Sequence, residues 1–204
     1  DFGFSEAFST AFDLSIAGRS CRNGSLPSTR WELYDSYTRR MLPSLAARAT
    51  ARDLAWFMGE NFRPILSSAE YERITEGYAS ELGAPVTVIE EVSRSGLLLV
   101  EADAIAFEHD LLKDFFRAEH LLRGASGQVL IDRLLEPKYA ELAELVIPNI
   151  TDEGTIRGLL SHADPRLLSL GFRGGLGPLA QSVIRQQCSD LLLKTRDTLP
   201  DVKI

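Results

Sequence analysis

A change of pattern at His109 constrains the fold more than any other feature of the sequence. Two apolar runs, 97–102 and 104–107, are broken by Asp103, a pattern typical of a short β-hairpin. After them, apolar residues recur at helical spacing over 111–122 and charged residues fill the other positions. His109 therefore marks the point where a strand passes into an amphipathic helix. The start of a helix has free N–H groups and about half a positive charge, so it suits an anion.

Three segments with helical character precede this hairpin: 50–63, 67–82 and 85–95. Ser67 and Glu70 form a capping box at the start of the second, because a Ser is followed three residues later by a Glu. Three helices, a hairpin and a fourth helix, in this order, predict a winged-helix domain over residues 50–124.

The segments on either side are also predicted to be helical. Residues 1–49 have the pattern of the end of a helical domain plus a linker helix, which begins after the capping box of Thr29 and Glu32. Residues 125–204 form a helical, repeat-like region without a fixed period, in which Gly and Pro separate five stretches: 129–135, 137–147, 151–162, 165–170 and 178–195. The predicted fold class is therefore mainly α: a winged-helix domain with one short β-hairpin, flanked by helical-bundle and helical-repeat-like segments.

The net charge of −7 lies in one part of the chain. Residues 52–123 hold 14 Asp and Glu against 7 Lys and Arg, and the remainder is balanced. The helix that would read DNA in a winged helix, 85–95, offers Glu90, Glu91 and only Arg94. Since phosphate contacts need a basic face, the sequence predicts no nucleic-acid partner.

Several classes of chemistry lack their motifs. The sequence has no G-x-x-x-x-G-K-[ST] phosphate loop, no G-x-S-x-G elbow and no His/Cys metal spacing, so this chain is predicted not to be an enzyme by itself. It also lacks an apolar run long enough to span a membrane, and a signal peptide. Cys21 and Cys188 are predicted to be reduced thiols of a cytoplasmic chain. His120 and His162 are interpreted as ordinary helix residues.

The residues around His109 also resemble a known family. The motif consists of a Phe two positions before the histidine, an acidic residue five positions after it, two aromatics and an alanine: Phe107, His109, Asp114, Phe115, Phe116 and Ala118. This motif resembles the end of the winged-helix domain in NACHT-type STAND nucleotide switches. The sequence departs from the family at Leu112, Lys113 and Arg117. Weaker similarity covers 26–34, which resembles the linker before that domain, and 137–139, which resembles the start of the helical region after it.

The resemblance implies a function for the parent protein. In this family the histidine hydrogen-bonds the β-phosphate of ADP, so His109 is the expected cofactor-binding residue. The chain would be the regulatory, sensor-side fragment of a signalling ATPase that binds ADP or ATP with Mg²⁺. Its partners would be a nucleotide-binding module N-terminal to Asp1, other copies on activation, and an unidentified ligand of the helical region.

Two other functions remain open. The chain could be a helical scaffold that binds proteins and has no nucleotide role, in which case His109 is an ordinary histidine at a strand end. It could also be a winged-helix nucleic-acid binder, which the acidic 85–95 segment disfavours. A phosphate loop encoded upstream of Asp1 would separate the switch from the scaffold.

Overall fold

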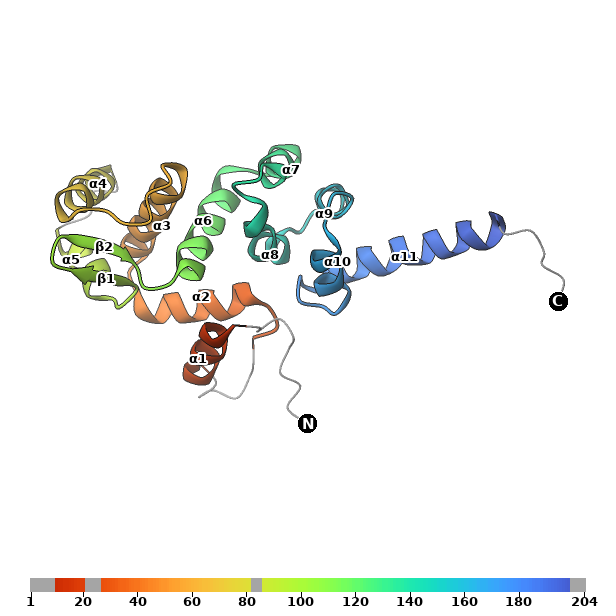
Figure 1. Ribbon diagram of the computed structural model, residues 1–204, viewed down its shortest axis with the longest axis horizontal. Coiled ribbons are helices and arrows are strands. Elements are labelled where there is room, and N and C mark those ends of the chain that lie inside the picture. The colour runs from red at the N-terminus through yellow and green to blue at the C-terminus, as the bar shows by residue number, and fades with distance from the viewer. Residues whose placement is uncertain (1–9, 21–26, 82–85, 199–204) are drawn as a thin grey trace. The chain divides into compact units, whose positions relative to one another are not determined.

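The computed structural model describes residues 10–20, 27–81 and 86–198, which are mainly helical with one two-stranded antiparallel sheet (Figure 1). The prediction of a mainly helical chain with one short hairpin is confirmed. The described residues form two compact units. The hairpin unit holds those of 10–27 and 31–125, and the C-terminal unit holds those of 28–30 and 126–198. Residues 31–49, predicted to belong to a preceding domain, thus lie in the same unit as 50–124, while 1–9 lie outside the described residues.

The elements of the hairpin unit follow one another in the order α1 (Ala11–Ser20), α2 (Arg30–Met41), α3 (Leu45–Glu60), α4 (Ser68–Glu81), α5 (Thr87–Arg94), β1 (Leu98–Glu101), β2 (Ala104–Phe107) and α6 (Asp110–Gly124). Among these elements α3 packs most extensively against α6. The two helices therefore form the centre of the unit.

The predicted bounds of α3 were wrong at both ends. The helix begins at Leu45 because the Ser44 hydroxyl accepts the N–H of Ala47 at 3.3 Å. It ends at Glu60 because Phe62 adopts a left-handed conformation with φ of 52°. The N–H of Phe62 bonds to the Gly59 carbonyl and that of Arg63 to the Met58 carbonyl, which is a Schellman motif.

The capping box predicted at the start of α4 is confirmed. The Ser67 hydroxyl accepts the N–H of Glu70 at 3.3 Å, and the Glu70 carboxylate accepts the N–H of Ser67 at 3.1 Å. Arg63 adds an ion pair to the same carboxylate at 2.5 Å. Ser67 follows Leu66, so this cap also fixes the chain next to the sheet.

The hairpin has a regular antiparallel register with a two-residue turn. Leu98 lies opposite Phe107 and Val100 opposite Ile105. On the far side of β2, Ile105 forms a bridge with Leu66, with N···O distances of 2.8 and 2.9 Å. β2 is therefore paired on both sides, whereas β1 has no strand on its outer side within the described part of the chain.

An aromatic cluster fills the core next to α6. Phe115 and Phe116 are both fully buried, as the sequence indicated. Phe116 packs against Phe107 of β2, and Phe115 against Trp31 and Tyr34 of α2. The cluster fixes α6 to the hairpin on one side and to α2 on the other.

The C-terminal unit consists of short helices: α7 (Gly127–Leu135), η2 (Ala140–Leu142), α8 (Ala143–Val146), η3 (Ile147–Asn149), α9 (Glu153–Leu160), α10 (Pro165–Phe172) and α11 (Pro178–Thr198). The continuous helix predicted over 137–147 is wrong, because this segment is a turn followed by η2 and α8. Pro148 has no N–H to extend α8, and the chain tightens into η3 there. No helix in the described ranges has both the length and the hydropathy to cross a membrane.

Candidate functional site around His109

His109 is the N-cap of α6. Its backbone is extended, with φ −148° and ψ 138°, and its Nδ1 accepts the N–H of Leu111 at 3.1 Å. Its carbonyl oxygen accepts the N–H of Leu112 at 3.0 Å and of Lys113 at 3.3 Å. The predicted position at the strand-to-helix junction is confirmed, but the capping role was not predicted.

This cap determines which ring nitrogen of the neutral side chain carries the proton. A nitrogen that accepts a hydrogen bond uses its lone pair, so Nδ1 of neutral His109 is unprotonated and Nε2 carries the hydrogen. The ring is half-buried and can therefore present one N–H donor, at Nε2, to a group beside it. Because the cap and the carbonyl occupy three of the first backbone N–H groups of α6, this donor is the main one the site offers to an anion.

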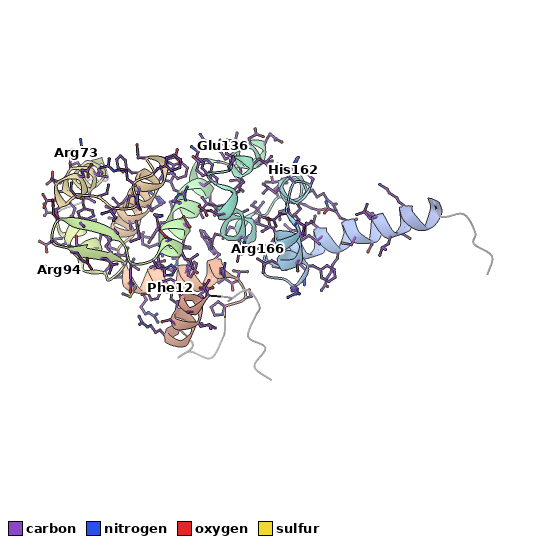
Figure 2. The ribbon with its side chains drawn as sticks, in the orientation of Figure 1. Phe12, Arg73, Arg94, Glu136, His162 and Arg166 are labelled. Carbon is purple, nitrogen blue, oxygen red and sulfur yellow. The ribbon has the colours of Figure 1, made fainter. Side chains whose placement is uncertain are left out.

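The His109 ring is held against α1. Phe12, labelled in Figure 2, stacks on it with ring centroids 4.0 Å apart and planes 13° from parallel. α1 is fixed in turn by Asp13, which is fully buried and accepts a hydrogen bond from the Tyr34 hydroxyl of α2. Thr10 and Asp13 cap the start of α1 reciprocally, at 3.1 and 3.0 Å. The imidazole is therefore positioned on two sides, by Phe12 and by the start of α6.

Asp110 beside the histidine is neutralised by its neighbour. Its carboxylate pairs with Lys113 Nζ at 2.6 Å. That hydrogen bond lowers the pKa of Asp110 below its ordinary value, although partial burial opposes the shift. Asp110 does not cap the helix, since His109 does so. Lys113, a departure from the family pattern, thus offsets the negative charge next to His109.

Arg117, the second charged departure, is accommodated by a glycine on the facing helix. Its side chain is buried and donates to Asp114 one turn earlier, at 2.9 Å. It lies against Gly59 of α3, where a Cβ atom would come within 2.2 Å of its Nε. The absence of a side chain at Gly59 therefore makes room for the guanidinium.

A buried ionic cluster joins α2, α3 and α6. The guanidinium of Arg48 on α3 contacts Asp35 at 3.0 Å and Thr38 at 3.2 Å, both on α2. It also contacts Glu119 of α6 at 3.4 Å. Arg48 was not singled out in the sequence, because nothing local distinguishes it from an exposed helix arginine.

His120, within α6, forms a separate cluster with α3. His120 Nδ1 lies 3.1 Å from the Asp53 carboxylate, and its ring stacks on Trp56 at 4.3 Å. Burial raises the pKa of Asp53, but hydrogen bonds from His120 and Arg52 outweigh this effect and leave the pKa below its ordinary value. His120 is partly exposed as predicted, yet its charged partner 67 residues away was not foreseen.

The remaining candidates do not assemble into a site. His162 is exposed and follows α9, next to which it is labelled in Figure 2. No group of three His, Cys, Asp or Glu side chains in the described residues could hold a metal ion. The chemistry that the His109 arrangement can supply is therefore hydrogen bonding to an anion.

Phe12 is the functional-site residue that sequence reasoning missed. Its contact with His109 joins positions 97 residues apart, and no local pattern carries that information.

Comparison with known proteins assigns no family to the chain: no protein-family model, no curated protein and no solved structure is significantly similar to it.

Proposed function

We propose that this chain is the regulatory, sensor-side part of a nucleotide-dependent switch of the STAND type, in which His109 contacts the β-phosphate of ADP. The nucleotide-binding module and Mg²⁺ would come from another part of the intact protein. Bound ADP would favour a closed monomer, and exchange for ATP would release the hairpin unit and permit self-association. The C-terminal unit would contact the sensed partner.

The observation that carries the proposal is the state of the His109 ring. With Nδ1 committed to the Leu111 N–H, the neutral ring has its proton on Nε2, where it can be donated to a phosphate oxygen. Stacking on Phe12 limits the ring to one orientation, so little side-chain entropy remains to be lost on binding. Lys113 reduces the repulsion that Asp110 would exert on a phosphate.

The order of the elements gives independent support. Three helices, α3 to α5, precede the hairpin and α6 follows it, which is the order of a winged helix with a C-terminal extension. Leu66, between α3 and α4, also pairs with Ile105 of the hairpin. We infer a winged-helix domain from this order.

A helical scaffold remains the second candidate. The observation in its favour is the exposed run Leu191, Leu192 and Leu193 on α11, whose side chains are more than half accessible. These side chains project around α11 in different directions, and exposed apolar surface of this kind can contribute to binding another protein. A scaffold would not need the His109 arrangement.

The test separates the cap from the phosphate contact. His109→Ser keeps a side-chain oxygen for the cap but removes the Nε2–H donor, whereas His109→Ala removes both. A hydrogen bond to a charged group is worth about 1.5–3 kcal/mol, so both variants of the full-length protein should retain ADP about ten- to a hundredfold less well. Both should also form oligomers without stimulus. Both variants lose the stacking on Phe12, but only His109→Ala also loses the cap, so it should be less stable than His109→Ser by about 0.5–2 kcal/mol.

The control is Phe116→Ala, which removes core volume and should lower the yield of folded protein by destabilising it about 3–5 kcal/mol, without activating it. The measurements are nucleotide content and oligomer size of the purified proteins. Normal ADP occupancy and a monomer peak in His109→Ser would reduce His109 to a capping residue and favour the scaffold.

A further inference from the structure

The outer edge of β1 has hydrogen-bonding groups directed away from the sheet. Ile105 of β2 uses its own N–H and C=O for Leu66, on the side away from β1. Val100 lies opposite Ile105 in the antiparallel ladder, as a pair that is not hydrogen-bonded to each other. The two residues of a non-hydrogen-bonded pair direct their N–H and C=O groups to opposite sides. The N–H and C=O of Val100 therefore point outward from β1. The N–H of Glu108, bonded to the Leu97 carbonyl at 2.8 Å, confirms this alternation.

This edge is exposed and apolar. The side chains of Leu99 and Val100 are 47% and 54% accessible. Exposed edge strands are usually protected by Lys, Pro or a bulge, because their open backbone groups pair with other chains. β1 contains no Lys, Pro or bulge; it is protected only by its length of four residues and by the charge of Glu101, which a partner would have to match.

The charge around the edge is of one sign. The segment 97–108 holds Glu101, Asp103 and Glu108 and no basic residue. Glu101 is exposed and lies two residues from Leu99, so both side chains are on the same face of β1. A second copy of this strand, paired antiparallel about Val100, would place Leu99 opposite Glu101 and leave the carboxylate without an opposite charge, whereas a basic segment would complement it.

We propose that β1 is a docking edge for an extended peptide segment of another protein that carries a Lys or Arg and, two residues later, an apolar side chain. The segment would add antiparallel to β1 and exchange both backbone hydrogen bonds with Val100. The residue before the one paired with Val100 would be basic and lie opposite Glu101. The residue after it would be apolar and lie opposite Leu99, because antiparallel strands run in opposite directions. This interaction does not depend on nucleotide or on His109.

The probe is the peptide acetyl-Thr-Lys-Thr-Val-Thr-amide, titrated into the isotope-labelled 204-residue chain at low salt. Binding should shift the amide signal of Val100 first, and those of Leu99 and Glu101 with it. The same peptide methylated on the central Thr nitrogen cannot donate to the Val100 carbonyl and should bind at least about tenfold more weakly, because one hydrogen bond is lost and a methyl group enters the ladder.

Two protein variants complete the test. Val100→Pro removes the outward N–H but leaves the β1–β2 bonds intact, since those are made by Leu99 and Glu101; it should weaken the peptide without unfolding the hairpin. Glu101→Lys should lose the Lys peptide and gain affinity for the peptide with Glu in its place. This exchange of charge preference does not depend on how well Val100→Pro folds.

Three outcomes would overturn the proposal. One is the absence of any shift at Val100 with either charge form of the peptide. Another is equal binding of the methylated and unmethylated peptides, which would show contact through side chains alone. The third is a concentration-dependent dimer that Val100→Pro abolishes, which would make a second copy of the chain the occupant of this edge.

Discussion

At the scale of single residues, Gly59 sets how closely α3 and α6 approach. A Cβ atom there would lie 2.2 Å from Arg117 Nε and 2.9 Å from its Cζ. Because Arg117 is buried and bonded to Asp114, it cannot move aside freely. We expect Gly59→Ala to destabilise the hairpin unit by about 1–3 kcal/mol in urea unfolding.

Gly77 on α4 is the matched control for this substitution. It is also helical, but it is exposed and has nothing within 4 Å of an added Cβ. Gly77→Ala should therefore stabilise the protein by up to about 1 kcal/mol, the difference in helix propensity. Similar effects from both substitutions would show that Arg117 is not tightly held.

Asp53 should make stability depend on pH in the acid range. Its pKa is lower in the folded chain than the unfolded value of about 3.9, so its ionised form contributes stability above that pH. The contribution is lost as pH falls through the folded-state pKa. Asp53→Asn should thus lower the urea midpoint at neutral pH, and this difference should shrink as the pH falls below about 3.9. A constant difference across pH would place the effect in packing instead of charge.

The role of His109 shows what a single residue reveals in sequence and what it does not. Its place between a strand and a helix was predictable, because both patterns are local. Its capping bond was not, since Ser, Thr, Asp and Asn are the usual caps. Its stacking on Phe12 was not either, because that contact depends on how α1 packs.

At the scale of elements, the end of α3 stores conformational strain. Phe62 holds φ of 52° with its ring 77% accessible, so it gains little from burial. The left-handed conformation costs a residue with a Cβ about 1–2 kcal/mol, and Gly avoids that cost. Phe62→Gly should raise the melting temperature, corresponding to a gain of about 1 kcal/mol.

Phe62→Asn gives a graded comparison, because Asn tolerates this conformation better than most residues. It should fall between Phe62 and Gly in thermal unfolding. Destabilisation by both substitutions would mean that the Phe62 ring makes contacts that outweigh the strain.

Elements with local signals were predicted and those set by packing were not. The hairpin and the Ser67 cap were found from short patterns, and the structure contains both. The ends of α3 were missed, since Ser44 lacks the acidic residue of a capping box and Phe62 replaces the usual glycine. The turn at 137–139 was missed because Pro137 is also typical of the first position of a helix.

At the scale of the whole molecule, the distribution of charge predicts no affinity for DNA. The excess acid lies in 52–123, and α5 exposes Glu90 beside Arg94, with which it pairs at 3.4 Å. We expect no shift of a duplex in a gel assay at low salt, where electrostatic binding is strongest. Micromolar binding that salt abolishes would contradict this expectation.

The contact between α3 and α6 also bears on how the hairpin unit folds. Arg48 and Glu119 are 71 positions apart, so their meeting closes a long loop, and α4, α5 and the hairpin must be accommodated within it. Chain entropy opposes such a closure before the contacts that reward it exist. We therefore expect the α3–α6 pairing to limit the refolding rate, and substitutions at Leu54 or Phe116 to slow refolding more than substitutions in the hairpin do. Stopped-flow kinetics of those variants would show whether a chain built mainly of short helices folds at the pace of a contact between helices far apart in sequence.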